Sequence, residues 1–149
     1  MPFQIKRAYE PPSSSDGSRV LVDRLWPRGI KKSTAALFCW MKDIAPSPAL
    51  RQWFDHRPDR FEEFRRRYER ELSHNALVPK LRDLGRNHLV TLVYGARDPL
   101  INHARVLRDA LTEKHNAANL NSPVPEPQEV AREIRRVSRA NAAQILAHK

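Results

Sequence analysis

Cysteine and glycine are scarce in this chain of 149 residues, which has one cysteine and four glycines. The lone Cys39 excludes an intramolecular disulfide framework and a metal site built from several cysteines. Ala45, not arginine, stands six positions after Cys39, so the phosphate-cradling loop of a cysteine phosphatase is absent. Gly29 and Gly95 belong to no glycine-rich phosphate loop.

Long apolar runs and familiar catalytic motifs are also missing. No stretch approaches the roughly 20 apolar residues that cross a bilayer, and the N-terminus lacks the apolar core of a secretory signal. The histidines show no metal-ligand spacing such as His-Glu-x-x-His, and no Gly-x-Ser-x-Gly elbow occurs. We therefore expect a cytoplasmic protein with no membrane partner, no metal and no cofactor; whether it is an enzyme stays open.

Basic residues, in contrast, are abundant. Lysine and arginine number 27 against 17 acidic residues, a formal net charge of +10, and arginine outnumbers lysine by 20 to 7. Guanidinium groups match phosphates and carboxylates through paired hydrogen bonds, so an acidic or phosphate-bearing partner is one interpretation. The codon bias of a genome rich in G and C is the other.

The apolar pattern predicts one α/β domain. Residues 3–7 alternate as a short strand, and residues 89–94 form the clearest strand. Residues 19–23 include three consecutive aliphatic side chains, which are typical of a strand buried on both faces under helices. Residues 1–115 are assigned to this domain.

Four longer helices are expected between and after these strands. The first begins at Pro48 with Ser47 as its cap, and the last at Pro99 with Asp98 as its cap. A helix over residues 61–72 carries four arginines and four glutamates outside its apolar stripe. We favour a solvated, self-paired face for these arginines, and the alternative is a phosphate-binding stripe.

The C-terminal part of the chain looks different in composition. Residues 116–127 are rich in proline and asparagine and predict a linker. Residues 128–149 predict an amphipathic helix, whose apolar stripe has to be covered by the domain itself or by a second chain in self-association.

Candidate site residues gather in two segments that each follow a predicted strand, residues 23–29 and 94–99. Ligands of α/β folds collect at the carboxyl ends of strands, and a helix N-terminus there favours an anion. We expect Arg24, Arg28 and Arg97 to bind such an anion through their guanidinium groups.

Other side chains complete this hypothesis. Asp23 would orient an arginine, and His103, in the first turn of the last domain helix, would act as an acid–base residue. Tyr94 and Asn102 would supply hydrogen bonds, with Tyr94 counted among the catalytic candidates and Trp26 among the ligand-binding ones. The alternative is structural: an internal ion pair for Asp23, a core position for Trp26 and a surface position for His103.

These segments also match a family pattern. The matching residues are Tyr9, Ser15–Gly17, Arg19–Gly29, Ala45–Ser47, Leu50–Arg51, Phe64, Tyr68, Glu71–Leu72, Tyr94, Ala96 and Asn102–Ala104. Over about residues 3–112 the chain resembles the YeaO-type branch of the domain of unknown function 488 family. The resemblance implies a small Rossmann-like sheet of three to four mainly parallel strands flanked by helices, with the C-terminal helix as an extension.

The resemblance brings no established activity. Longer relatives carry a Cys-x-Glu segment at the end of the last strand and a Cys-His-Arg segment on the next helix. The corresponding segments here resemble Tyr94–Ala96 and Asn102–Ala104, so both thiols are missing and only His103 matches. Thiol chemistry is therefore not expected.

Two functions are left open by the sequence. The first is binding of a phosphate-bearing or other small anionic ligand at the strand ends. The second is sequence-neutral binding of nucleic acid by an arginine-rich surface, with an affinity that falls steeply with salt. Arginines clustered in a pocket favour the first function, and a broad stripe favours the second.

Overall fold

The computed structural model describes residues 2–113 together with Gln128 and Arg132. Its strands form one parallel sheet, in the order β1-β4-β2-β3. The strands are β1 (Phe3–Arg7), β2 (Ser18–Leu21), β3 (Cys39–Trp40) and β4 (Val90–Tyr94). The helices are α1 (Lys32–Ala35), α2 (Pro48–Phe54), α3 (Phe61–Ser73), α4 (Leu77–Leu84) and α5 (His103–Glu113). The predicted α/β fold with a small parallel sheet is confirmed.

The last strand along the chain lies in the middle of the sheet. β4 pairs with β1 on one side and with β2 on the other, so the connection from β1 to β2 has to pass across the position of β4. β3 adds a fourth strand beside β2. It is only two residues long, too short for a periodic sequence pattern to reveal.

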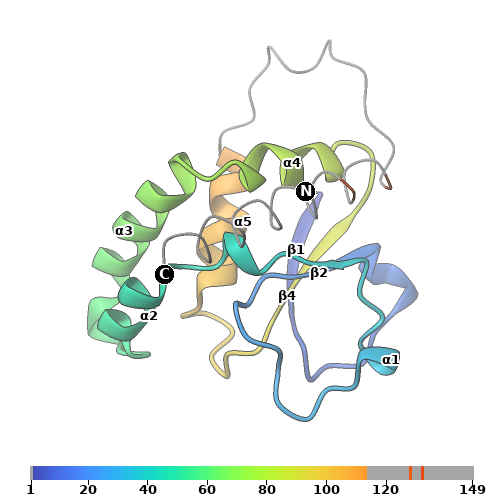
Figure 1. Ribbon diagram of the computed structural model, residues 1–149, viewed down its shortest axis with the longest axis horizontal. Coiled ribbons are helices and arrows are strands. Elements are labelled where there is room, and N and C mark those ends of the chain that lie inside the picture. Colours follow the sequence, from blue (N-terminus) through green and yellow to red (C-terminus); the bar gives the residue numbers. More distant parts are fainter. Residues whose placement is uncertain (1, 114–127, 129–131, 133–149) are drawn as a thin grey trace, which may run out of the picture.

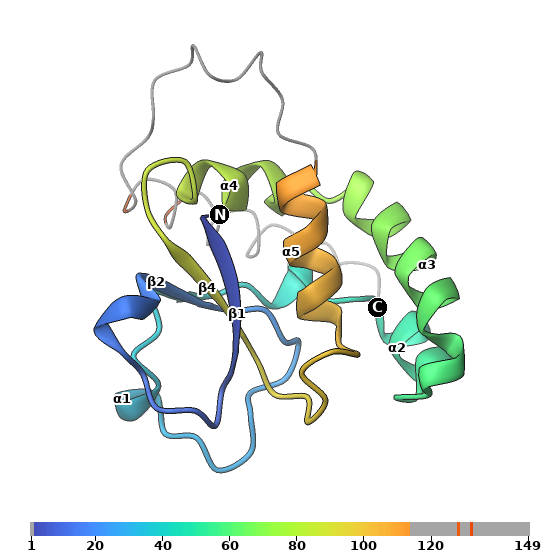
Figure 2. The same ribbon diagram turned by 180° about the vertical axis from the view of Figure 1, so that it is seen from behind.

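The sheet separates two apolar cores. Val90, Leu92 and Tyr94 of β4 pack into the larger core with the helices α2 to α5, whereas Val93 faces the other side. Figures 1 and 2 show α2, α3 and α5 on one side of the sheet and α1 on the other. The smaller core consists of Ala8, Leu21 and Val93 under the partly buried Trp26, Ile30, Leu37 and Trp40.

The two predicted helix caps have different outcomes. α2 begins at Pro48 with the Ser47 hydroxyl as its cap, as predicted. The prediction for Asp98 is wrong, because its carboxylate accepts hydrogen bonds from the N–H groups of residues 100 and 101 instead. α5 begins only at His103, so this histidine is the first residue of the helix.

The arginine face of α3 is largely paired. Glu63 contacts Arg67 at 3.1 Å and Arg66 at 3.6 Å. Arg65 contacts Asp109 of α5 at 3.3 Å. These contacts match the interpretation of a self-paired face.

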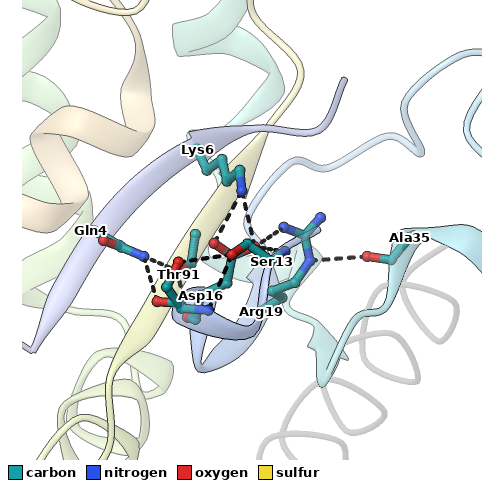
Figure 3. Close-up of polar contacts among 8 residues, drawn as sticks. Gln4, Lys6, Ser13, Asp16, Arg19, Ala35 and Thr91 are labelled. Carbon is teal, nitrogen blue, oxygen red and sulfur yellow. Dashed lines mark hydrogen bonds and ion pairs between the residues drawn. The ribbon is translucent and has the colours of Figure 1, made fainter. Parts of the chain in front are cut away.

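Asp16 is the centre of a buried polar cluster between the strands (Figure 3). Its carboxylate accepts hydrogen bonds from the Ser13 N–H at 2.9 Å, the Lys6 ammonium at 3.1 and 3.2 Å, and the Arg19 guanidinium at 2.8 Å. The Thr91 hydroxyl donates to the backbone carbonyl of Asp16 at 2.6 Å. Burial alone would raise the pKa of Asp16, but the three donors outweigh it and hold this pKa below its ordinary value.

Gly17 follows Asp16 at a point where no other residue fits. Its φ is +63°, and a Cβ there would lie 2.1 Å from the backbone oxygen of Leu89. The same oxygen accepts a hydrogen bond from the Ser18 N–H at 2.9 Å, next to the first pair of the β2–β4 ladder. The close approach at Gly17 is therefore needed for β2 to start beside β4.

The C-terminal predictions fall outside the described residues, apart from Gln128 and Arg132. They comprise the linker over 116–127, the helix over 128–149 and self-association through that helix. In the part of the chain that is described, no helix is both long and apolar enough to span a membrane.

We expect Asp16→Asn to destabilise the fold by about 3–5 kcal/mol, because Lys6 and Arg19 lose their carboxylate partner. A carboxyl group whose pKa is lowered by folding adds stability above its unfolded-state pKa of about 3.9 and loses it as pH falls through the folded-state pKa. Below about pH 4, the free energy of unfolding measured in urea should therefore fall less steeply with decreasing pH in the variant than in the wild type. An equally steep fall in the variant would contradict the stabilising role given to the Asp16 carboxylate.

Gly17→Ala is expected to cost at least about 2 kcal/mol, because strain at positive φ adds to the clash with Leu89. Gly29→Ala is the matched control. Gly29 also has positive φ, +82°, but no atom lies within 4 Å of its added Cβ. Thermal and urea unfolding of both variants would reveal the difference, and equal losses would show that the close approach at Gly17 is unimportant.

Candidate functional site

A cavity of about 210 Å³ lies at the carboxyl ends of β2 and β4, beside the start of α5. Because parallel strands end on the same edge of a sheet, segments far apart in the sequence meet here. The polar side chains that line it are Asp23, Arg24, Arg51, His56, Asn102 and His103. Four of these six are among the predicted site residues.

Asp23 and His103 join the strand ends to α5. One carboxylate oxygen of Asp23 accepts a hydrogen bond from the Gly95 N–H at 2.8 Å, and the other lies 3.2 Å from His103 Nε2. His103 Nε2 is also 3.0 Å from the backbone oxygen of Val22. Since both neighbours of Nε2 are acceptors, this nitrogen carries the hydrogen. The Val22 carbonyl thus holds the imidazole, and the Asp23 oxygen beside it is buried without a hydrogen-bond partner among the described residues, whereas the sequence predicted that Asp23 would orient an arginine.

Arg24 is held loosely at the cavity wall. Its Nη1 is 3.8 Å from the Asp43 carboxylate, and its Nη2 is 3.4 and 3.5 Å from the backbone oxygens of Ala45 and Pro46. These distances exceed those of strong hydrogen bonds. Its buried Nε makes no hydrogen bond within the described residues. Because Nε is buried, the two Nη groups, which make only long contacts, are the donors that a bound anion can use.

Asn102 is buried and acts as the N-terminal cap of α5. Its Oδ1 accepts a hydrogen bond from the Arg105 N–H at 2.9 Å, and its Nδ2 donates to the backbone oxygen of Asp98 at 2.8 Å. Both polar atoms of the amide are engaged with the backbone. Asn102 therefore shapes the cavity wall and positions the helix start.

Arg51 and His56 also line the cavity, although they are not among the site residues predicted from the sequence. Arg51 belongs to α2, and His56 follows the end of that helix. Asp55 and His56 have φ values of +49° and +53°. Two consecutive left-handed residues other than glycine are uncommon, and this reversal places His56 at the cavity. Periodicity and capping patterns carry no information about such a reversal.

Four predicted site residues lie elsewhere. Arg28 and Arg97 are exposed and do not line the cavity formed by the described residues. Trp26 packs edge-on against Trp40 on the opposite face of the sheet, with ring centres 5.4 Å apart. Tyr94 is buried in the larger core, where burial and the charge of Glu10 raise its pKa.

Some cavity residues that were not predicted as site residues belong to the family pattern. Arg51, Pro46 and Phe64 line the cavity and are also among the residues that carry the resemblance. His56 is not among them. Within the described residues, no group of three or more histidine, cysteine or acidic side chains could hold a metal ion.

Comparisons with known proteins agree with the resemblance. The family described as the inactive DUF488-N3 subclade matches residues 2–127. The uncharacterised protein YeaO of Escherichia coli is 46% identical over 112 residues, which cover 74% of this chain and 97% of that protein. The uncharacterised protein Rv3073c of Mycobacterium tuberculosis is 44% identical over 108 residues, 72% of this chain and 92% of that protein. No solved structure gives a significant match.

We expect Tyr94→Phe to flatten the loss of stability at alkaline pH. A tyrosine whose pKa is raised by folding adds stability below its unfolded-state pKa of about 10 and loses it as pH rises through the folded-state pKa. Phenylalanine does not titrate, so the free energy of unfolding of the variant lacks this contribution to the alkaline decrease. Urea unfolding from pH 8 to 11 measures it, and identical alkaline slopes for both proteins would rule the effect out.

Proposed function

Because the chain belongs to the inactive DUF488-N3 subclade, we propose that its cavity binds a small anionic ligand and catalyses no reaction on it. The observation that supports this best is the gathering of four basic side chains on a cavity lined by one carboxylate, that of Asp23. The basic residues are Arg24, Arg51, His56 and His103.

The distribution of partners favours an anion. One carboxylate oxygen of Asp23 accepts a hydrogen bond from the Gly95 N–H, and the other lies 3.2 Å from His103 Nε2 but has no hydrogen-bond partner among the described residues. The Nη groups of Arg24 make only long contacts of 3.4 to 3.8 Å, and Arg51 is exposed to solvent at the cavity. The start of α5 adds the partial positive charge of a helix N-terminus. An oxyanion would therefore gain charge-assisted hydrogen bonds from groups that have weak partners without it.

The residues that line the cavity support the proposal that no reaction is catalysed there. None of the described lining residues is cysteine, serine, threonine or lysine. At the two positions where longer relatives carry thiols, this chain has Tyr94, which is buried in the core, and Asn102, whose amide caps α5. His103 Nε2 is held between two oxygens of the strand end. The described lining thus offers an anion a basic surface and no thiol, hydroxyl or amine nucleophile.

The described residues do not favour the alternative, which is nucleic-acid binding through a broad arginine stripe. Three arginines of α3 have acidic partners within 3.6 Å, two of them on Glu63 of the same helix. Paired guanidinium groups have less to gain from phosphate contacts, because they would have to give up their carboxylates. This function stays a prediction, as does self-association through residues 128–149.

Arg24→Ala is expected to weaken binding of inorganic phosphate by about 10- to 100-fold, the value of one charge-assisted hydrogen bond of about 1.5–3 kcal/mol. Arg28→Ala is the matched control, because it removes the same charge from the same loop at a residue outside the cavity. Isothermal titration calorimetry at low ionic strength measures both affinities, and thermal unfolding checks that each variant folds.

Arg51→Ala provides a second measurement if Arg24→Ala does not fold, because Arg51 is exposed and its loss leaves the core intact. Its control is Arg57→Ala, which lies beyond the end of α2 and pairs with Asp59 on the surface. Loss of affinity in the cavity variants alone supports the proposal. Equal affinities in all four variants, or no phosphate binding by the wild type, would refute it.

A further inference from the structure

The cavity has an apolar lining as well as a basic one. Phe54 of α2 and Phe64 of α3 stack on each other with ring centres 4.3 Å apart, and both line the cavity. Ile101, just before α5, and Leu25, just after β2, extend this apolar lining. An inorganic anion would use only the basic groups and would leave these side chains without a function in binding.

Building on the proposed function, we propose that the ligand is a small organic monoacid, in which one oxyanion is attached directly to one aromatic or branched aliphatic group. The oxyanion is a phosphate monoester or a carboxylate, since both match the guanidinium group of Arg24. The apolar group packs against the side chains of Phe54, Phe64, Ile101 and Leu25.

The size of the cavity limits the ligand. An apolar cavity of about 150 Å³ holds one benzene molecule. A volume of about 210 Å³ therefore has room for a single ring and one oxyanion. The cavity is partly open to solvent, so a nucleotide bound by its phosphate would extend out of it, because its ribose separates the phosphate from the base. Nucleotides are therefore not expected to gain from the apolar lining.

The exposure of Leu25 fits this class of ligand. Its side chain is 63% exposed even though it lines the cavity, and Leu100 is 62% exposed without lining it. An apolar group bound in the cavity would cover part of this leucine. Leu25 and Leu100 therefore form a matched pair of exposed leucines, of which only Leu25 lines the cavity.

The test compares affinities of simple probes by isothermal titration calorimetry. We expect phenyl phosphate to bind about 10- to 100-fold tighter than inorganic phosphate, because the ring buries roughly the area of a phenylalanine side chain. Benzoate and acetate form the corresponding carboxylate pair, and the tighter of the two aromatic probes identifies the oxyanion. Adenosine 5′-monophosphate is expected to bind within about threefold of inorganic phosphate.

Leu25→Ser is expected to reduce the ratio of phenyl phosphate to phosphate affinity by about 3- to 10-fold, because part of the apolar contact is lost. Leu100→Ser is expected to leave this ratio unchanged. Equal affinities within both probe pairs would overturn the inference while leaving anion binding intact. Adenosine monophosphate binding as tightly as phenyl phosphate, or equal effects of the two leucine substitutions, would also overturn it. If no probe binds at all, the proposed function fails as well.

Discussion

The arrangement of the sheet depends on the hydrogen bonds that the carboxylate of Asp16 accepts. It lies on the connection that crosses from β1 to β2, and it accepts hydrogen bonds from Lys6 of β1 and Arg19 of β2. The backbone carbonyl of Asp16 accepts a hydrogen bond from the hydroxyl of Thr91, which belongs to β4, the strand between β1 and β2. A buried carboxylate needs its partners to offset desolvation, so the three strands are held in one relative placement. Gly17 permits the close contact with Leu89 that this placement requires.

The position of β4 between β1 and β2 has a direct consequence for the site. It brings Gly95, at the end of β4, within hydrogen-bonding distance of Asp23, 72 positions earlier in the chain. The same carboxylate lies 3.2 Å from His103 at the start of α5. The cavity is therefore built from strand ends and a helix start that the sheet topology places together, and α2 and α3 close it with Arg51 and two phenylalanines.

Much of the fold could be predicted from local patterns, and less of the site could. The strand over residues 3–7 has the predicted limits, and residues 20–22 are as fully buried as their aliphatic run predicted. The cap of α5 could not be predicted, because Asp98 and Asn102 are both good capping residues and tertiary packing decided between them. His56 was missed because a left-handed conformation at a histidine has no local sequence pattern.

The sequence by itself determined the family, the fold class and the burial of the central strands. These depend on the residues and their order along the chain, in which the periodicity of apolar side chains indicates strands, helices and burial. Only the tertiary structure decided which arginines share a cavity. Arg24, Arg28 and Arg97 are chemically equivalent in the sequence, but only Arg24 lines the cavity, beside backbone oxygens of the segment before α2. The direction of a side chain depends on contacts with distant segments, and the order of residues along the chain does not contain those contacts.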